Sequence, residues 1–245
     1  MKNSQLIYGI RAIIEAIDAK KPLNKLFIQR GLKGDLYKEL ETKVRKNGLS
    51  VSYVPLEKLN RLTANNHQGA VAQVSPVSFH EFEPLMESIF EKNTSPLLLL
   101  LDQLTDVRNF GAIIRTAECT GIDAIIVPTS GSAPITEDTV KTSAGAVFNV
   151  PISKVNHLKD AVFYLQSSDI QIVGATEKTN DSIYTVDFKK PTAIIMGSED
   201  KGISSSLMKL IDVKAKLPLK GDIESLNVSV ACGVFLYEAL RQRLS

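Results

Sequence analysis

The chain has 245 residues, 44% hydrophobic and 23% charged, a composition that excludes a disordered or fibrous protein and leaves room for one or two domains. No apolar run approaches the roughly 18 residues of a membrane-spanning helix, and the N-terminus lacks the apolar core of a signal peptide. Cys119 and Cys232 lie in apolar helical patterns, so we expect them to behave as small hydrophobes in a reducing compartment. These features predict a cytoplasmic protein without membrane contact.

The net charge of +2 conceals an uneven distribution along the chain. Residues 1–75 hold 13 Lys and Arg against 6 Asp and Glu, a net of +7, whereas residues 76–245 hold 16 against 21, a net of −5. A small basic part followed by a mildly acidic part favours a polyanion bound by the first and chemistry carried out by the second. A solvated lysine-rich surface is the alternative interpretation of the basic part.

Alternating helical and strand patterns in residues 1–75 predict a small α/β domain. Residues 6–19 indicate a helix whose buried face is Ile10, Ile13, Ile14 and Ile17. We expect further helices over 35–47 and 56–62, and strands over 26–29, 51–54 and 69–74. Residues 75–96, bracketed by prolines, indicate a linker with a short helix over 85–91.

From residue 96 onward strands alternate with helices, which predicts a mostly parallel sheet covered on both faces. The expected strands are 97–101, 122–127, 170–174 and 192–196, and the expected helices are 110–120, about 136–141, and 156–166. A short strand ending at Leu217–Pro218 and a helix from Leu226 complete the pattern. We expect one buried stripe on this last helix, formed by Leu226, Val230, Val234, Leu236, Tyr237 and Leu240.

Three loops that follow strands combine glycine with polar side chains. In the first, residues 101–121, the helix buries Phe110, Ile113, Ile114 and Ala117. Arg108, Gly111 and Arg115 share another face, and Asn109 is placed to cap the helix. Because ligands in open α/β sheets bind beyond the carboxyl ends of strands, this face is a candidate site. The alternative is an ion pair between Arg115 and Glu118 on a solvated helix.

The second loop, residues 196–204, places Glu199 between Gly197 and Gly202. It matches neither the dinucleotide-binding nor the phosphate-binding glycine motif. It is therefore either a loop whose backbone approaches a ligand closely or a surface turn. The missing dinucleotide motif also argues against a dinucleotide-dependent oxidoreductase.

The third stretch, residues 216–245, has a polar start to an apolar helix. Asp222, Glu224 and Ser225 stand where helix N-caps are found, and Asn227 and Ser229 lie in the first turn. A polar helix N-terminus suits a ligand, although a simple packing helix has the same pattern.

Together these stretches resemble the SpoU-type ribose 2′-O-methyltransferases of the SPOUT superfamily. The matching pieces are NFGAIIRTA (109–117), IMGSEDKGIS (195–204) and LPLKGDIESLNVSVACGVFLYE (217–238). IYGIRAIIEAI (7–17) and NHQGAVAQV (66–74) resemble the small substrate-binding domain of the ribosomal-RNA members. The resemblance implies a small RNA-binding domain (1–75), a linker (76–95) and a methyltransferase domain (96–245).

The resemblance also implies S-adenosylmethionine as cofactor, a deep trefoil knot in the C-terminal part, and a homodimer whose active site is completed across the interface. It assigns the cofactor to Gly197, Leu217 and Leu226, and the catalytic group to Asn109, Arg115, Glu199, Ser225 and Asn227. The implied substrate is a guanosine of large-subunit ribosomal RNA. A tRNA ribose 2′-O-methyltransferase and a non-catalytic RNA-binding ribosome-assembly factor are the alternatives.

The residue types suit transfer of an already activated methyl group, which requires a positioned ribose hydroxyl and the loss of one proton. An arginine has a pKa above about 12 and is a poor base, so we expect Arg115 to bind the adjacent phosphate and to stabilise the developing alkoxide. Ser225 and Asn227 would orient the ribose or hold the loop, and Glu199 would fix Arg115 or Asn109.

The histidines and the basic residues complete the candidate list. His67, His80 and His157 are scattered along the chain, so we expect no metal site. The charge of residues 1–75 favours binding of folded RNA through phosphates and shape. The candidate RNA contacts are Arg11, Arg30, Lys33 and Arg61.

Overall fold

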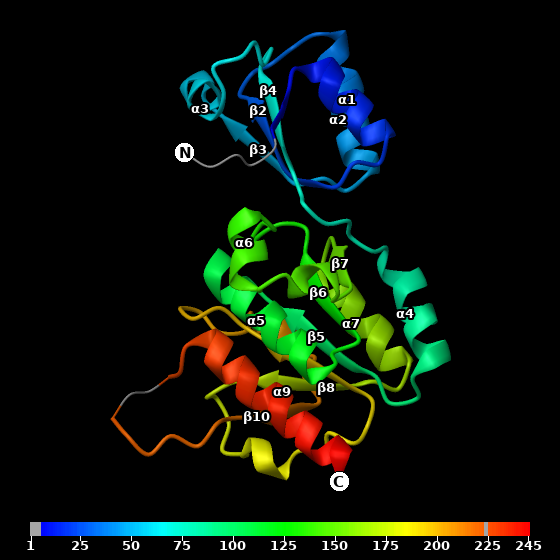
Figure 1. The fold of residues 1–245 in the computed structure, drawn as a ribbon, viewed down its shortest axis with the longest axis vertical. Coiled ribbons are helices and arrows are strands. Elements are labelled where there is room, and N and C mark those ends of the chain that lie inside the picture. Colours follow the sequence, from blue (N-terminus) through cyan, green and yellow to red (C-terminus); the bar gives the residue numbers. More distant parts are fainter. Residues whose placement is uncertain (1–5, 223–224) are drawn as a thin grey trace. The chain divides into compact units, whose positions relative to one another are not determined.

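The computed structural model describes residues 6–222 and 225–245, which fall into two compact units (Figure 1). Unit 1 is Met1–Ser78 with Pro134–Glu137, and unit 2 is Phe79–Ala133 with Asp138–Ser245. Within unit 1 the buried Asn24 holds the second segment, because its Nδ2 donates to the Ile135 carbonyl at 2.6 Å and its Oδ1 accepts from the Ile135 amide at 3.2 Å. Glu224, one of the predicted N-cap candidates, lies outside the described residues.

Unit 1 contains a four-stranded sheet in the order β1-β4-β2-β3, with helices on both of its faces. The strands are β1 (Leu6–Tyr8), β2 (Leu23–Gln29), β3 (Val51–Val54) and β4 (Ala70–Val74), and the helices are α1 (Ile10–Asp18), α2 (Asp35–Lys46) and α3 (Leu56–Leu62). On one face α1 and α2 pack with Leu26 and Ile28, and on the other Leu59 of α3 packs against Val54 and Val71.

The start of unit 1 differs from the sequence prediction. Residues 6–8 form β1, which pairs antiparallel with β4, and the helix begins only at Ile10. Gly9 lies between them with a φ of 90° and turns the chain. A strand of three residues has too few alternations to stand out beside a helical pattern. The predicted buried face of the helix, Ile10, Ile13, Ile14 and Ile17, is confirmed.

Unit 2 is built on six parallel strands in the order β10-β8-β9-β5-β6-β7, which confirms the predicted parallel sheet. The strands are β5 (Leu97–Leu101), β6 (Ala124–Pro128), β7 (Ile152–Val155), β8 (Gln171–Ala175), β9 (Thr192–Met196) and β10 (Val213–Ala215). The helices are α4 (Phe82–Lys92), α5 (Val107–Thr120), α6 (Glu137–Thr142), α7 (Leu158–Ser167), α8 (Ser205–Met208) and α9 (Val228–Leu244). Short 3₁₀ turns cover Ala146–Phe148 and Ile183–Thr185.

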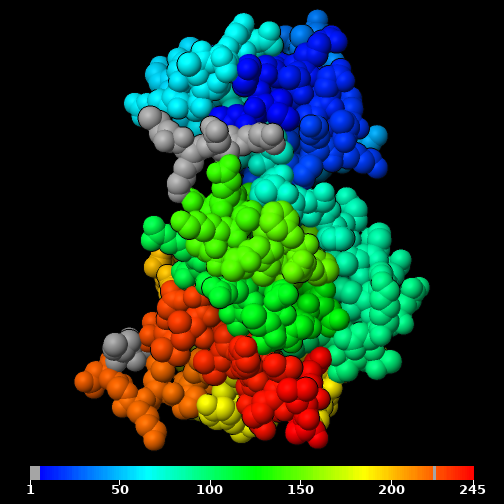
Figure 2. Space-filling model, viewed as in Figure 1, coloured from blue at the N-terminus to red at the C-terminus, as the bar shows by residue number. Residues whose placement is uncertain are grey.

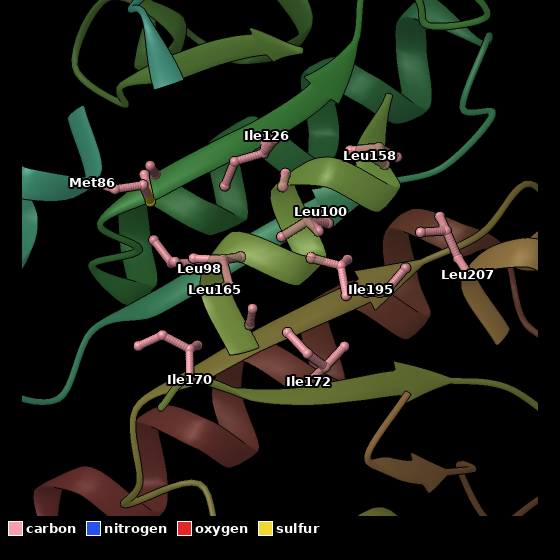
Figure 3. Packing of buried hydrophobic residues seen from close by; sticks show 14 of the residues in the cluster. Met86, Leu98, Leu100, Ile126, Leu158, Leu165, Ile170, Ile172, Ile195 and Leu207 are labelled. Carbon is pink, nitrogen blue, oxygen red and sulfur yellow. The ribbon is translucent and has the colours of Figure 1, made fainter. Parts of the chain in front are cut away.

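Every residue of the two central strands β5 and β9 is buried, as their continuous apolar sequences predict. Figure 3 shows one face of the sheet, where strand side chains such as Leu98, Leu100 and Ile195 meet Met86 of α4 and Leu165 of α7. The segment predicted as a linker therefore contains a helix that belongs to the core of unit 2. Two short elements, β7 and α8, were not predicted.

Of the stripe predicted for the last helix, Leu236 is fully buried, but the helix turns a different face toward the core. Its buried apolar side chains are Val228, Cys232, Phe235, Leu236 and Ala239. Leu226, Val230 and Tyr237 are 42%, 53% and 54% exposed. A helix that is apolar around most of its circumference offers more than one apolar stripe, and periodicity alone does not decide which one faces the sheet.

The two cysteines lie in different environments. Cys232 is buried, which agrees with its predicted behaviour as a small hydrophobe, and burial raises the pKa of its thiol to about 12. Cys119 is exposed near the end of α5, so it does not pack as the small hydrophobe that its sequence pattern predicts. Cys119 follows the exposed Glu118 and lies outside the stripe of Phe110, Ile113 and Ala117, which the structure confirms as buried.

Candidate active site

Asn227 joins three loops through one side-chain amide. Its Oδ1 accepts from the backbone amides of Ser229 at 3.0 Å and Val230 at 3.3 Å, which makes Asn227 the N-cap of α9. Its Nδ2 donates to Oδ1 of Asn109 at 3.0 Å and to Oε1 of Glu199 at 2.5 Å. The side-chain oxygen of Asn227 therefore caps α9, and its side-chain nitrogen binds Asn109 and Glu199.

Asn109 reaches this cluster because another residue caps its helix. Asp106 is the N-cap of α5, and its carboxylate accepts from the backbone amides of Arg108 at 2.9 Å and Asn109 at 2.8 Å. The prediction that Asn109 caps the helix was wrong. Its side chain points instead to Asn227, 118 positions further along the chain.

The loop after β9 holds Glu199 in a tight turn. Ser198 and Gly202 exchange two backbone hydrogen bonds of 2.9 and 3.2 Å, and the backbone amide of Ser204 donates to Asp102 at the end of β5 at 2.7 Å. A Cβ atom on Gly197 would lie only 2.0 Å from the carbonyl carbon of Gly202. Position 197 therefore requires glycine because the loop folds back on its own backbone.

A hollow of about 630 Å³, open to solvent, lies beside this cluster. Its walls come from segments that follow three neighbouring strands: Thr176 and Glu177 after β8, Gly197–Glu199 after β9, and Lys216–Leu217 after β10. Ser225, Leu226, Ala231 and Phe235 close it from the α9 side. The hollow therefore lies beyond the carboxyl ends of parallel strands, which is where ligands bind in open α/β sheets.

All three predicted cofactor residues, Gly197, Leu217 and Leu226, line this hollow, as do Glu199 and Ser225 of the predicted catalytic group. The contribution of Thr176 and Glu177 was not predicted, because no motif marks the end of β8. The contribution of Phe235 was not predicted either, since an aromatic residue in an apolar helix has the same pattern as any core residue.

Arg115 lies apart from the cluster within one chain. It is exposed on α5, six residues beyond Asn109, which is about 9 Å along the helix axis. It does not line the hollow, and within residues 6–222 and 225–245 its guanidinium makes no hydrogen bond or ion pair, with Glu118 or any other residue. Gly111 does not admit a ligand, because an added Cβ would meet Thr142 Oγ1 at 1.8 Å.

The four predicted RNA contacts are all exposed on unit 1 but belong to different layers of it. Arg11 lies on α1 and Arg61 on α3, which cover opposite faces of the sheet. Arg30 follows β2, where its Nε donates to the Tyr53 carbonyl at 3.2 Å, and Lys33 lies in the loop before α2.

The described part of the chain shows no sign of a metal site or of a membrane span. It contains no group of three or more His, Cys, Asp and Glu placed to hold a metal ion. It also contains no helix with the length and apolar character needed to span a membrane.

Residues 96–237 match the SpoU rRNA Methylase family, and residues 6–80 match a domain described as RNA 2′-O ribose methyltransferase substrate binding. The chain belongs to the SpoU rRNA methylase family.

Individual relatives agree with this assignment. The chain is 33% identical to YacO of Bacillus subtilis, named as a TrmH family tRNA/rRNA methyltransferase, over 97% of this chain and 95% of YacO. Among solved structures, an AdoMet-bound rRNA methyltransferase from Sinorhizobium meliloti is 26% identical with a TM-score of 0.62, covering 98% of this chain and 88% of that one. The SpoU methyltransferase AviRb from Streptomyces viridochromogenes, in complex with AdoMet, is 25% identical with a TM-score of 0.61, covering 98% and 90%.

Proposed function

We propose that this protein transfers a methyl group from S-adenosylmethionine to the 2′-hydroxyl of a guanosine in large-subunit ribosomal RNA, in the cytoplasm. The observation that carries the proposal is the meeting of Asn109, Glu199 and Asn227 beside a hollow at the carboxyl ends of β8, β9 and β10. The description of the matching N-terminal domain supports a ribose hydroxyl as the acceptor. The two similar structures with AdoMet bound support the cofactor.

The residues around the hollow fit this cofactor. Leu217, Leu226 and Phe235 would supply apolar contacts to the cofactor, and the backbone of the turn at Gly197 would supply polar groups. Glu199 and Ser225 lie at the same hollow and supply polar side chains. When bound, the cofactor supplies a methyl group activated by a positively charged sulfur.

The cluster offers one free donor and one free acceptor to a ribose. Asn227 uses the Oδ1 of Asn109 and the Oε1 of Glu199, and within the described residues neither the Asn109 amide nitrogen nor the Glu199 Oε2 has a partner. A hydroxyl placed between them donates to the carboxylate and accepts from the amide. Glu199 and Asn109 would in this way orient the hydroxyl and prepare its proton for release.

In this proposal the protein is a homodimer, and Arg115 of one protomer acts at the active site of the other. Val230, Val234 and Tyr237 share one face of α9, and the first and last are more than half exposed. Figure 2 shows that the C-terminal part of α9 (red) lies at the surface of unit 2. The α5 helix lies beside α9 and runs in the same direction, because Asn109 contacts Asn227 and Thr116 lies beside Gly233. Pairing of two such faces would cover the apolar stripe and bring Arg115 of one protomer toward the cluster of the other.

The trefoil knot is also part of this proposal. It is supported by the path of the chain after the edge strand β10 in the sheet order β10-β8-β9-β5-β6-β7. The segment that follows β10 lines the hollow with Leu217, Leu219 and Leu226, and the chain then returns as α9, which packs beside α5.

The deciding experiment maps 2′-O-methyl groups in rRNA and tRNA from cells with and without the gene, and then tests the purified protein with labelled S-adenosylmethionine on the unmodified RNA. We expect one guanosine of large-subunit rRNA to lose its methyl group in the deletion strain and to regain it in vitro. A lost tRNA methyl group would favour the tRNA alternative, which the tRNA/rRNA names of the relatives support. RNA binding without binding of S-adenosylmethionine would favour the non-catalytic assembly factor.

A further inference from the structure

The two sides of the unit 1 sheet differ in how their charges are paired. The side covered by α1 and α2 carries five of the six carboxylates of residues 1–75. Three ion pairs neutralise charge there: Lys38–Asp35 at 3.1 Å, Lys43–Asp18 at 2.6 Å and Arg45–Glu41 at 3.1 Å. A polyanion that approaches the side covered by α1 and α2 therefore meets both positive and negative charges.

The opposite side, on which α3 lies, presents unpaired cations. Lys58 and Arg61 are exposed on α3, and Lys25 is half-buried on β2. None of the three makes an ion pair within the described residues, and Glu57 is the one carboxylate that α3 carries. Lys25, Lys58 and Arg61 therefore outnumber the single carboxylate of α3, and no ion pair in the described part of unit 1 holds any of them.

Two aromatic side chains lie on the same side of the sheet as these cations. Tyr8 of β1 and Phe27 of β2 both pair with Val71 of β4, so the three side chains form one row across the sheet and point to the same face. Tyr8 is 40% exposed and Phe27 is half-buried. Because β4 lies between β1 and β2, the two rings are two strand spacings apart, about 10 Å, and each is a separate stacking surface.

The cations surround the inner of these two rings. The Nζ atoms of Lys25 and Lys58 lie 5.7 and 5.8 Å from the centroid of Phe27. A nucleobase stacks on an aromatic ring more strongly than an exposed ammonium does, and the displaced ammonium can pair with the phosphate of the same nucleotide. This combination of rings and unpaired cations is typical of surfaces that bind single-stranded nucleic acid.

We propose that Tyr8, Lys25, Phe27 and Lys58, here called the α3-side surface, bind an unpaired stretch of the RNA substrate. The inference rests on the proposed function for the identity of the substrate. Bases stack on Tyr8 and Phe27, and Lys25 and Lys58 bind the flanking phosphates. A regular A-form duplex keeps its bases stacked inside and does not offer them to these rings, so the surface selects loops, bulges or ends.

The experiment measures binding of the full-length protein to a fluorescent single-stranded RNA and to a duplex of the same sequence over a series of salt concentrations. We expect Tyr8→Leu and Phe27→Leu, which keep apolar packing but remove the ring, to weaken single-strand binding about fivefold or more without changing the salt dependence. Lys25→Gln and Lys58→Gln should each reduce the slope of log affinity against log salt by about 0.7. Lys46→Gln on α2 removes the same charge from the side covered by α1 and α2 and should change the affinity little.

Several results would overturn the inference: equal losses in Lys46→Gln and Lys58→Gln, larger losses in Arg11→Gln or Lys33→Gln, or equal affinity for duplex and single strand. Melting temperatures of all variants exclude unfolding as the cause of a loss.

Methyl transfer is measured on the same proteins to separate the two proposals. Binding through the α3-side surface without methyl transfer would support this inference and contradict the proposed function. Methyl transfer that is unaffected by all four substitutions would support the proposed function and contradict this inference.

Discussion

At the scale of single residues, Asn227 has two tasks that substitutions can separate. Asn227→Ser keeps an oxygen for the cap of α9 but removes the Nδ2 group that contacts Asn109 and Glu199. We expect the free energy of unfolding to change by less than about 0.5 kcal/mol, because serine caps helices as well as asparagine does. Methyl transfer should fall about 100-fold, since the site loses a fixed donor. Urea unfolding and single-turnover assays test this, with Asp106→Asn, which preserves the cap of α5, as control.

Arg115 tests whether a guanidinium or only a positive charge is needed. We expect Arg115→Lys to lose at least about tenfold in kcat, because an ammonium lacks the planar fork that binds phosphate and an alkoxide together. Arg108→Lys, on the same face of α5, is the matched control and should remain near wild type. Nearly full turnover by Arg115→Lys would remove the need for the guanidinium.

Lys154 is a residue whose burial should lower stability. Desolvation lowers the pKa of Lys154 from its ordinary 10.5 to about 8, and its Nζ lies 3.7 Å from the Phe79 ring centroid. Below pH 8 both folded and unfolded chains carry the proton, so the full cost of burying the charge is present. Between pH 8 and 10.5 the unfolded chain binds more protons, and the wild type gains stability as pH rises.

Lys154→Met should therefore raise the free energy of unfolding by about 1 to 3 kcal/mol at pH 7, with the Phe79 contact keeping the gain toward the lower end. The gain should shrink as the pH rises from 8 to 10.5. Denaturant unfolding of both proteins at pH 7 and pH 10 measures it. A gain that is the same at both pH values would show that packing, rather than charge burial, is responsible.

At the scale of helices and strands, the end of α9 is tied to the loops that lead into the central strands. Arg243 donates to the carbonyl oxygens of Ser95 at 2.6 Å, Pro96 at 3.2 Å, Phe188 at 2.8 Å and Lys190 at 3.0 Å. Burial lowers the pKa of Arg243. One side chain therefore joins the entrances of β5 and β9 to the last helix.

Arg243→Lys should lower the free energy of unfolding by about 1 to 3 kcal/mol, because a single ammonium cannot reach four carbonyl groups and leaves some without donors. Urea unfolding followed by circular dichroism measures the change. Arg45→Lys, in an exposed ion pair with Glu41, is the control and should cost less than about 0.5 kcal/mol. Equal losses of unfolding free energy in Arg243→Lys and Arg45→Lys would contradict the idea that Arg243 holds α9 to the loops before β5 and β9.

The elements also show what periodicity can and cannot predict. The bounds of β3, α3, β5 and β9 were predicted correctly, because each is a strongly patterned segment next to a clear breaker. The strands β1 and β7 and the helix α8 have only three or four residues and were missed. The buried stripe of α9 was wrong because that helix is apolar on more than one face.

The candidate site was only partly predictable from local sequence. The polar residues were visible in three loops, but the contact between Asn109 and Asn227 exists because β5 and β9 are neighbours in the sheet although they are far apart in the chain. Strand order depends on long-range packing, which a local pattern does not contain. From the sequence, only the resemblance to a known family predicted that the three loops form one site.

At the scale of the whole molecule, the proposed dimer can be tested by mixing two inactive variants. If Arg115 acts on the partner's cluster, Arg115→Ala and Asn227→Ala combine into a heterodimer with one complete site. With free exchange of protomers, an equimolar mixture should recover about one quarter of wild-type activity. If Arg115 acts within its own chain, the mixture stays inactive. Light scattering confirms that both variants remain dimers.

The crowding at Gly197 changes how mutational scans of this protein should be interpreted. Any side chain at that position collides with the protein's own backbone, so substitutions there will score as damaging whether or not anything binds nearby. Intolerance at this glycine consequently carries no information on recognition of a small molecule. Glu199, two positions on, is exposed, so its replacement causes no such collision, and its scores report on the contact with Asn227 and on chemistry.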